Sequence, residues 1–253
     1  MGLEKKELIL SASQINLFIE EPALWVLQYF YGVRGGSNIY AVRGKSVEEY
    51  VNEAITQGVI PTLSGFVKIA VAKSLQDNVE ITEEDIERFY KWGEKVLPLV
   101  QSFKITGQQI ALTGDLNGIK IKGYADFAFG DELVDLKTVS KVPTLLIRTD
   151  RKGMLSKDKS ANVRQQVIYK ELSGRDTSLL FVDEQGNSLH YVIQQSDIDE
   201  QLPIIQDAIN KIKNILTMNL KDVILQISPK NINSFYWDEI TRNKAKELWT
   251  ITN

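Results

Sequence analysis

Two aspartates and a lysine lie close together in the stretch GYADFAFGDELVDLKT, residues 123–138. Asp126 lies in its first half, and Asp135 and Lys137 lie in its second half, separated by one residue. The Gly-Asp dipeptide between the halves predicts a tight hairpin turn that joins two antiparallel strands. In that register Asp126 faces Asp135 directly, and the pleat places Lys137 on the same side of the sheet. The three side chains are therefore expected at one site.

Opposed carboxylates repel each other, and a divalent cation bound between them would remove this penalty. Carboxylate oxygens are preferred ligands of hard cations such as Mg²⁺ and Mn²⁺. A lysine beside such an ion can position or deprotonate a water molecule, or stabilise charge that develops on a phosphate. The hairpin therefore predicts metal-assisted hydrolysis of phosphodiester bonds. The alternative is a structural ion pair between Asp135 and Lys137, since acidic-x-Lys triplets also begin at Glu4 and Asp150.

The composition of the chain excludes most other kinds of catalytic site. The 253 residues include no cysteine and a single histidine, His190, which excludes thiol nucleophiles, disulfides, iron–sulfur clusters and sites built from several histidines. The formal net charge is −3, so a surface that binds an acidic partner must be local. No apolar run is long enough for a membrane span and no signal peptide is evident, which predicts a soluble, cytoplasmic protein with no membrane partner.

The elements around the hairpin are predicted from hydrophobic periodicity, caps and turns. Helices are expected at residues 11–18, 23–30, 44–56 and 64–76, from 82 onward, and at 161–172, 196–217 and 237–249. Strands are expected at residues 106–113, 119–129, 132–139, 178–182 and 188–193. This order predicts a mixed α/β fold in which helices flank a central mixed sheet. We expect one domain over residues 1–253, with a helical part at 1–103, a sheet core at 104–194 and C-terminal helices at 195–253.

Five sequence elements, two of them in the hairpin itself, occur in a characteristic order along roughly residues 11–170. Asp126 lies in GYAD, and Asp135-Leu136-Lys137-Thr138 follows it as a DxKT element. Glu48 comes four residues after Gly44 on a predicted helix, and the opening segment reads SASQINLFIEEPALWVLQY. Gln165-Gln166-Val167-Ile168-Tyr169 has the pattern Q-x-x-x-Y. Together these features resemble the motifs of the PD-(D/E)xK nuclease superfamily, in particular its RecB-like and lambda-exonuclease-like branch.

The resemblance implies a restriction-endonuclease-like core with Mg²⁺ or Mn²⁺ as the cofactor. The implied catalytic residues are Glu48, Asp126, Asp135 and Lys137, and the implied metal ligands are Glu48, Asp126, Asp135 and the carbonyl of Leu136. Lys137 would position or activate water, while Gln165 and Tyr169, on one helix face, would support the substrate. Glu49 would replace Glu48 if the helix register differs by one residue. Many RecB-like members have histidine at the Glu48 position, and the members with an iron–sulfur cluster need cysteines that this chain lacks.

A basic stretch between the catalytic strand and the Gln165 helix is the expected DNA-binding segment. Residues 148–164 hold six basic residues and two acidic residues, a local excess of +4. Such an excess favours phosphate contacts, although a solvated loop is the alternative. Arg43, next to Gly44, is a second candidate for a phosphate contact. The basic residues of the stretch are Arg148, Arg151, Lys152, Lys157, Lys159 and Arg164.

The combined expectation is a Mg²⁺- or Mn²⁺-dependent DNA nuclease. An exonuclease that processes DNA ends in recombination, repair or phage replication fits the resemblance best, and duplex ends or single strands of DNA would be its partners. The alternatives are a noncatalytic DNA-binding or assembly subunit with the same fold and a structure- or sequence-specific endonuclease.

Overall fold

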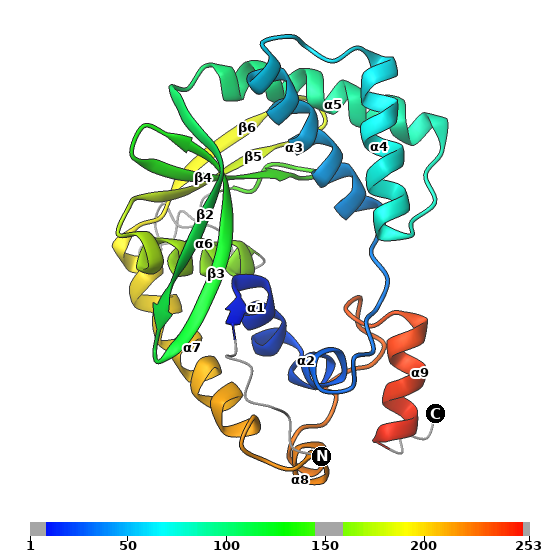
Figure 1. Cartoon of the computed structure of the whole chain (residues 1–253), viewed down its shortest axis with the longest axis vertical. Coiled ribbons are helices and arrows are strands. Elements are labelled where there is room, and N and C mark those ends of the chain that lie inside the picture. The colour runs from blue at the N-terminus through cyan, green and yellow to red at the C-terminus, as the bar shows by residue number, and fades with distance from the viewer. Residues whose placement is uncertain (1–8, 145–158, 250–253) are drawn as a thin grey trace.

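The computed structural model describes residues 9–144 and 159–249. Within them, six strands form one mixed sheet with helices on both faces (Figure 1). The fold class is therefore the predicted mixed α/β class. The strands are β1 (Ile9–Ser11), β2 (Ile105–Leu116), β3 (Ile119–Phe129), β4 (Glu132–Thr138), β5 (Thr177–Val182) and β6 (Ser188–Val192).

The helices of the described part lie before, within and after this set of strands. Five of them precede β2, which agrees with the helical periodicity of the first hundred residues. They are α1 (Ala12–Glu20), α2 (Pro22–Tyr29), α3 (Ile39–Gln57), α4 (Leu63–Asp77), α5 (Glu83–Gln101), α6 (Ser160–Ser173), α7 (Gln195–Ile215), α8 (Leu220–Gln226) and α9 (Glu239–Leu248). No helix in residues 9–144 and 159–249 is long and apolar enough to cross a membrane.

Strand β3 is the centre of the sheet because it pairs with three other strands. β2 runs antiparallel along one edge of β3 for almost its whole length. β1 and β4 share the other edge: β1 pairs in parallel with residues 120–122, and β4 pairs antiparallel with residues 127–129. β5 then pairs in parallel with β4, and β6 completes the order β1-β3-β4-β5-β6. Residues 123–126 of β3 therefore have no strand partner on that edge in the described part of the chain, because β1 ends before them and β4 begins after them.

Two tight turns set the register of the β2–β3–β4 meander. Asn117 and Gly118 both have positive φ angles, 52° and 74°, as a hairpin turn of the favoured twist requires. Gly130 has a φ of 63° at the predicted Gly-Asp turn. Phe129 then pairs with Glu132 and Phe127 with Val134, as the sequence predicts.

The two faces of the sheet are covered by different helices, which leaves the hairpin between two apolar layers. One layer joins Ile121, Leu133 and Phe181 of the sheet to α1, α6 and α7. The other joins Phe127, Val134, Leu136 and Leu180 to α3, α4 and α5. The apolar face of the β3–β4 hairpin, Phe127, Phe129, Val134 and Leu136, contacts this second layer.

Two elements were not predicted. β1 has only three residues, and its last residue, Ser11, is also the N-cap of α1, so the local pattern is that of a helix start. Its pairing with β3 joins residues more than a hundred positions apart, which no local pattern reports. The segment 1–103, expected to be helical, therefore includes a strand. Helix α8 has only seven residues and lies after the long helix that was expected to end at residue 217.

Candidate active site

Asp126 and Asp135 come together where β3 and β4 separate. The ladder ends at the pair Phe127–Val134, because beyond it β4 pairs with β5, Asp135 lying beside Leu179. Instead of facing Asp135 across a continuous ladder, Asp126 accepts a hydrogen bond from the backbone N–H of Leu136 through Oδ2, at 2.8 Å. The expectation that Asp126 and Asp135 face each other directly across the strands is therefore wrong, because the strands have already separated there. Burial, and then the charges of Asp135 and Glu48, raise the pKa of Asp126 well above its usual value.

Asp135 and Lys137 form a close ion pair inside this gap. The Asp135 side chain is 1% exposed, and its Oδ2 lies 2.5 Å from Lys137 Nζ. Its other oxygen, Oδ1, is buried and has no hydrogen-bond partner among the described residues. Burial alone would lower the pKa of Lys137, but the charges of Asp135 and Asp126 outweigh burial and raise it. Lys137 is therefore held as a cation beside the carboxylates.

Glu48 reaches the same charges from helix α3. Burial and the charge of Asp135 raise the pKa of Glu48, while a hydrogen bond donated by the Gln109 amide to Glu48 Oε1 lowers it. The neighbouring Glu49 instead pairs with Lys73 at 3.4 Å, so Glu48 and not Glu49 is the glutamate that lies at this cluster. A Cβ placed on Gly44 would meet only Thr138 Oγ1, at 3.8 Å, an ordinary contact. The described contacts therefore give no steric reason for a glycine at this position.

The Gln165–Tyr169 pair of α6 packs on the β3 side of the gap. Gln165 Nε2 donates to the Tyr169 hydroxyl at 2.9 Å, so the predicted i, i+4 pair forms a direct hydrogen bond. A Cβ on Gly123 would lie 2.5 Å from the Tyr169 ring, a distance that no side chain tolerates. Gly123 thus allows the Tyr169 ring to reach the strand, where the Tyr169 hydroxyl lies beside the backbone of Tyr124. A glycine inside a strand is the sequence signal of such an approach.

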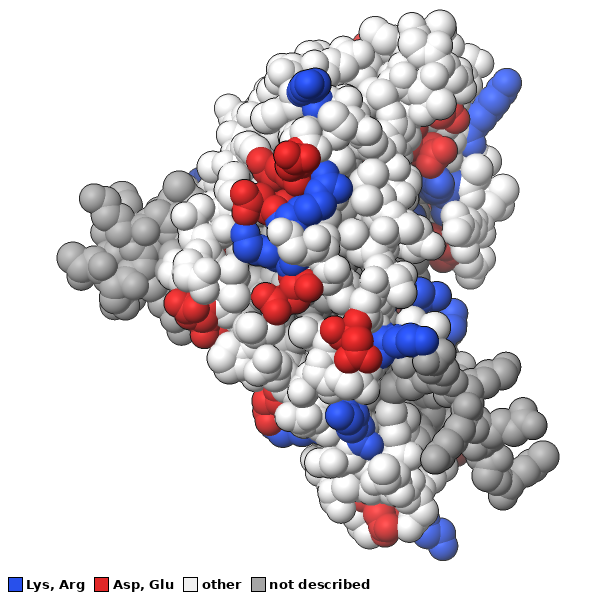
Figure 2. Space-filling model, turned by 60° about the vertical axis from the view of Figure 1, so that its left-hand side comes forward, with Lys and Arg blue, Asp and Glu red and all other residues white. Residues whose placement is uncertain are grey.

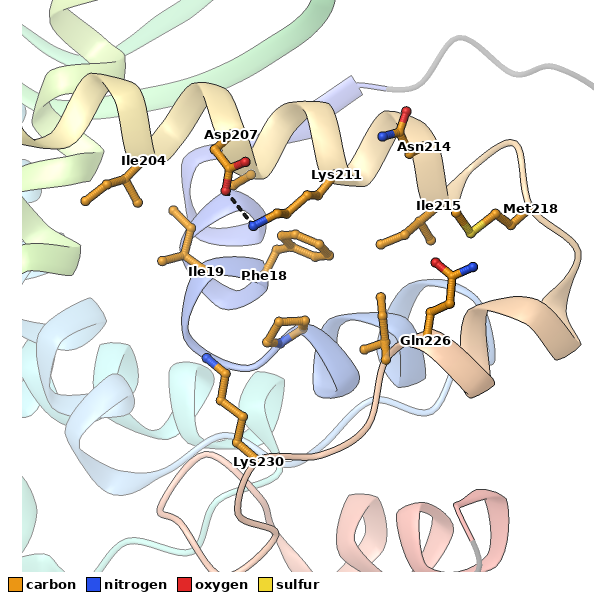
Figure 3. Close-up of a pocket in the computed structure, with 13 residues that line it drawn as sticks. Phe18, Ile19, Ile204, Asp207, Lys211, Asn214, Ile215, Met218, Gln226 and Lys230 are labelled. Atoms are coloured by element: carbon orange, nitrogen blue, oxygen red, sulfur yellow. Dashed lines mark ion pairs between the residues drawn. The ribbon is translucent and has the colours of Figure 1, made fainter.

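A hollow of about 430 Å³ lies over this cluster. Its lining includes Tyr40, Gly44, Lys45, Glu48, Asp126, Asp135, Leu136, Lys137, Asn162 and Gln165. A separate pocket of about 480 Å³ lies between α1, α7 and the segment after α7 (Figure 3). Its lining includes Phe18, Ile19, Ile204 and Ile215, and its Lys211 pairs with Asp207 at 2.6 Å. Only the first hollow brings predicted catalytic residues together.

The predicted basic contacts are distributed differently. Arg43 is buried, donates to the Thr138 carbonyl at 2.9 Å and lies 4.1 Å from the Trp92 ring, so it ties α3 to the end of β4. Arg164 is buried and bonds to Asn16 at 2.9 Å and to Glu20. Lys159 is the N-cap residue of α6. The remaining four, Arg148, Arg151, Lys152 and Lys157, lie outside the described residues.

Two of these arginines therefore hold protein groups, and their contact with substrate stays a prediction. On the face in Figure 2, basic and acidic side chains are interspersed and form no continuous basic band. This pattern agrees with the low net charge of the chain.

The donor set suits a Mg²⁺ or Mn²⁺ ion in part. The unpartnered Oδ1 of Asp135 is a buried oxygen that a cation could satisfy, and Mg²⁺ often uses only one or two carboxylates together with water. In residues 9–144 and 159–249, however, no three acidic or histidine side chains are spaced to hold one ion together. Asp135 therefore fits an ion best, with Asp126 and Glu48 beside it, and the Leu136 carbonyl stays a predicted ligand.

Gln109 is the site residue that sequence reasoning missed. Its φ of 48° is left-handed, which costs a residue with a side chain free energy and marks a position worth a functional hypothesis. It lies on β2 between the residues that pair with Ala125 and Phe127, so it is opposite Asp126 of the neighbouring strand β3. Nothing in its sequence context distinguishes it, because its contact with Glu48 joins residues 61 positions apart.

Replacing Gln109 with glycine is expected to weaken Mn²⁺ binding about 10- to 100-fold, the usual effect of removing a partner that orients a ligating group. Glycine accepts the left-handed backbone, so the fold should be retained. Gln108→Ala is the matched control, because it removes a neighbouring contact to α3, Thr56 Oγ1 at 3.2 Å, without touching Glu48. Calorimetric titration with Mn²⁺ measures both. Equal affinities in the two variants and the wild type would show that Gln109 does not orient a ligand.

The raised pKa values of Asp126 and Glu48 predict an unusual pH dependence of stability in EDTA. Each carboxyl binds its proton more tightly in the folded chain than in the unfolded chain. The free energy of unfolding should therefore fall as pH rises from the ordinary carboxyl pKa values toward the raised ones. Folding lowers the pKa of other groups, such as Asp183 and Asp238, and the stability that they contribute is lost only as pH falls near and below their ordinary pKa. Their effect is therefore opposite in sign and lies at lower pH.

Thermal melts in EDTA from about pH 5 to pH 8, run on the wild type and on Asp126→Asn, test this expectation. Asparagine keeps an acceptor for the Leu136 N–H but cannot ionise. The asparagine variant should show a weaker fall than the wild type. Parallel pH profiles for the two proteins would mean that Asp126 has no raised pKa.

Comparison with known proteins supports the fold. No protein-family model matches this chain, and no curated protein matches its sequence. A candidate exonuclease from Eubacterium rectale has a similar structure, with a TM-score of 0.62 at 14% identity over 96% of this chain and 93% of the other. SSO0001 gives a TM-score of 0.35 at 16% identity, over 87% and 88% of the two chains. LHK-Exo in complex with dAMP gives 0.34 at 12% identity, over 70% and 92%.

The first of these likenesses establishes a shared fold, and the other two are too weak to add to it. The fold and the site together define a mixed α/β protein with a buried carboxylate–lysine cluster at the point where its central strand changes partner.

Proposed function

We propose that this protein is a divalent-metal-dependent nuclease that hydrolyses phosphodiester bonds of DNA, acting on DNA ends. The observation that supports it most is the pairing within one buried site of Lys137 with Asp135, whose second carboxylate oxygen has no partner. Two further carboxylates with raised pKa values lie beside this pair. Clustering of perturbed carboxylates in a hollow is typical of catalytic sites. The name of the Eubacterium rectale protein supports the choice of an exonuclease.

Each residue of the cluster has a distinct part in the proposed reaction. Asp135, Asp126 and the Leu136 carbonyl would hold a Mg²⁺ or Mn²⁺ ion, and Glu48 would bind beside them. When bound, such an ion stabilises charge on phosphate oxygens and lowers the pKa of water. The raised pKa of Lys137 favours its protonated form, so the ammonium would orient the attacking water and stabilise charge at the phosphate. Gln165 and Tyr169 would support the substrate beside the gap between β3 and β4.

The setting that we propose is DNA recombination, repair or phage replication. One observation favours the second candidate, a noncatalytic DNA-binding or assembly subunit with this fold. No three-carboxylate group in the described part of the chain is spaced for an ion. A site that no longer binds metal would have this arrangement too.

A comparison of DNA forms separates these functions. Purified protein is incubated with closed-circular, linear duplex and single-stranded DNA, each with Mn²⁺ and with EDTA. Loss of linear or single-stranded DNA in Mn²⁺ alone, with circles intact, is the expected result. Nicking of the circular DNA would show that the protein is an endonuclease and not an exonuclease. Binding without cleavage in Mn²⁺ or Mg²⁺ would favour the noncatalytic subunit, and neither binding nor cleavage would refute the proposal.

A further inference from the structure

The solvent-facing side of the β2–β3 hairpin leads directly to the candidate active site. Along β3, the exposed residues Lys122 and Tyr124 alternate with buried Ile121, Gly123 and Ala125. Across β2, Tyr124 pairs with Ala111 and Lys122 with Thr113, both exposed. In Figure 1 this long hairpin extends well past the shorter strands of the sheet. Lys122 and Tyr124 thus lie on a bare strip of sheet surface.

Tyr124 is an unusual residue at this position. Its side chain is 57% exposed although it lies in the central strand of the sheet, where aromatic side chains are ordinarily covered. The small Ala111 opposite leaves the ring uncovered on that side. In residues 9–144 and 159–249, the Tyr124 ring contacts no other aromatic ring and Lys122 has no ion pair. An exposed ring and a neighbouring unpaired cation are the two groups that bind a base and a phosphate.

The backbone of Tyr124 is fixed even though its ring is exposed. On one edge of β3, pairing with β1 ends at Lys122 and pairing with β4 begins at Phe127. The residues between them have no strand partner on that edge among residues 9–144 and 159–249. Within this interval the backbone of Tyr124 lies beside the hydroxyl of Tyr169, which accepts from Gln165 at 2.9 Å. The helix pair that was expected to touch substrate thus holds the strand that presents the ring. A platform fixed in advance loses little entropy when a ligand stacks on it.

The spacing from the catalytic residues fits a neighbouring nucleotide. Tyr124 and Asp126 are two residues apart on one strand, which corresponds to about 7 Å along it. A base stacked on Tyr124 would therefore belong to a nucleotide next to the phosphate at the carboxylates. Lys122, a further two residues along, would meet the following phosphate of the same strand.

We propose that Tyr124 is a stacking platform for an unpaired DNA base beside the scissile phosphate, with Lys122 as its phosphate contact. The ligand is single-stranded DNA, either as such or as the frayed end of a duplex. This inference rests on the proposed nuclease function and adds its substrate form. A base inside a duplex is stacked on both of its faces, so it must leave the stack before it can use the platform, whereas an unpaired base has a free face.

The test compares variants of Tyr124 on single-stranded DNA. Tyr124→Thr keeps a strong strand former but removes the ring, and Tyr124→Phe keeps the ring. Base stacking on an aromatic side chain is worth about 1–3 kcal/mol, which corresponds to about a 5- to 150-fold loss of affinity. We expect this loss for oligo(dT) in the threonine variant, measured by fluorescence anisotropy in EDTA, and near wild-type binding in the phenylalanine variant. Lys122→Ala should flatten the salt dependence of binding.

A fluorescent base reports stacking directly. An oligonucleotide with 2-aminopurine at successive positions from its end should show quenching at one position with the wild type and Tyr124→Phe, and none there with Tyr124→Thr. Phe235→Ala, which removes an 88% exposed aromatic ring elsewhere on the chain, serves as the control. If the wild type cleaves DNA but Tyr124→Thr binds, quenches and cleaves like it, the platform is wrong and the nuclease function stands. If the wild type neither binds nor cleaves DNA, the proposed function fails, and the platform fails with it. Thermal melts of each variant establish that it is folded.

Discussion

Replacing Asp135 with asparagine is expected to lower DNA cleavage by about 10³-fold or more, because the lost metal stabilisation is worth several kcal/mol. Asparagine keeps the shape of the side chain and removes its charge. Asp135 is 1% exposed and has an oxygen with no partner, so it is the carboxylate on which binding of an ion most depends. Stabilisation of the fold by Mn²⁺ should disappear together with the activity, since a ligand stabilises only in proportion to its binding.

In EDTA the same variant should melt close to the wild type. The loss of the ion pair with Lys137 lowers stability, while relief of repulsion with Asp126 and Glu48 raises it. We expect a change within about 1 kcal/mol, or about 2–4 °C in Tm for a chain of this size. Asp176→Asn is the matched control, because Asp176 forms a similar ion pair with Lys170, at 2.6 Å, on the surface. Retention of the full Mn²⁺ shift in Asp135→Asn would show that Asp135 is not a ligand.

The hairpin could be predicted because its information is local. Gly130 takes a φ of 63°, which glycine accepts without strain, and the alternation on either side fixes which residues pair. That register brings Asp126, Asp135 and Lys137 into one place. The point at which the two strands separate could not be predicted in the same way. It depends on β5, which pairs with Asp135 from a part of the chain some forty residues away.

The contacts that complete the site are also long-range. Glu48 and Gln109 are 61 positions apart, and Arg43 and the Thr138 carbonyl are 95 positions apart. A basic residue in a sequence is compatible with a phosphate contact or an internal carbonyl, and only the fold distinguishes them. Arg43 has a protein contact of the second kind, because its guanidinium is buried beside Trp92, and its contact with a phosphate stays a prediction. Gly123 had a signal of its own, a glycine inside a strand, whose cause became clear only with Tyr169 above it.

The charges of the cluster explain why one lysine matters to both stability and chemistry. Three carboxylates, Glu48, Asp126 and Asp135, influence one another, and Lys137 is the cation that offsets them. A divalent ion and Lys137 therefore have partly overlapping electrostatic roles. This overlap predicts opposite effects of removing the lysine on metal binding and on turnover.

Lys137→Met is expected to lower turnover by about 10²- to 10⁴-fold, the usual range for a group that positions or transfers protons in a reaction. Mn²⁺ should still bind, as tightly as in the wild type or more tightly. Lysine is not a ligand of such ions, and its removal frees Asp135 Oδ2 from the 2.5 Å ion pair. In EDTA the variant should melt below the wild type, because the carboxylates lose their cation, and Mn²⁺ should restore more stability to it than to the wild type.

Calorimetry with Mn²⁺, melts with Mn²⁺ or EDTA, and single-turnover cleavage of labelled DNA measure the three effects on one preparation. Lys170→Met, which breaks the surface pair with Asp176, controls for the loss of a lysine and should change none of them strongly. Lys137→Arg keeps the charge and should therefore recover stability in EDTA, but its planar guanidinium cannot occupy the place of an ammonium, so turnover should stay low. Loss of Mn²⁺ binding in folded Lys137→Met would contradict the assigned role, because it would make the lysine necessary to the ion rather than to the reaction.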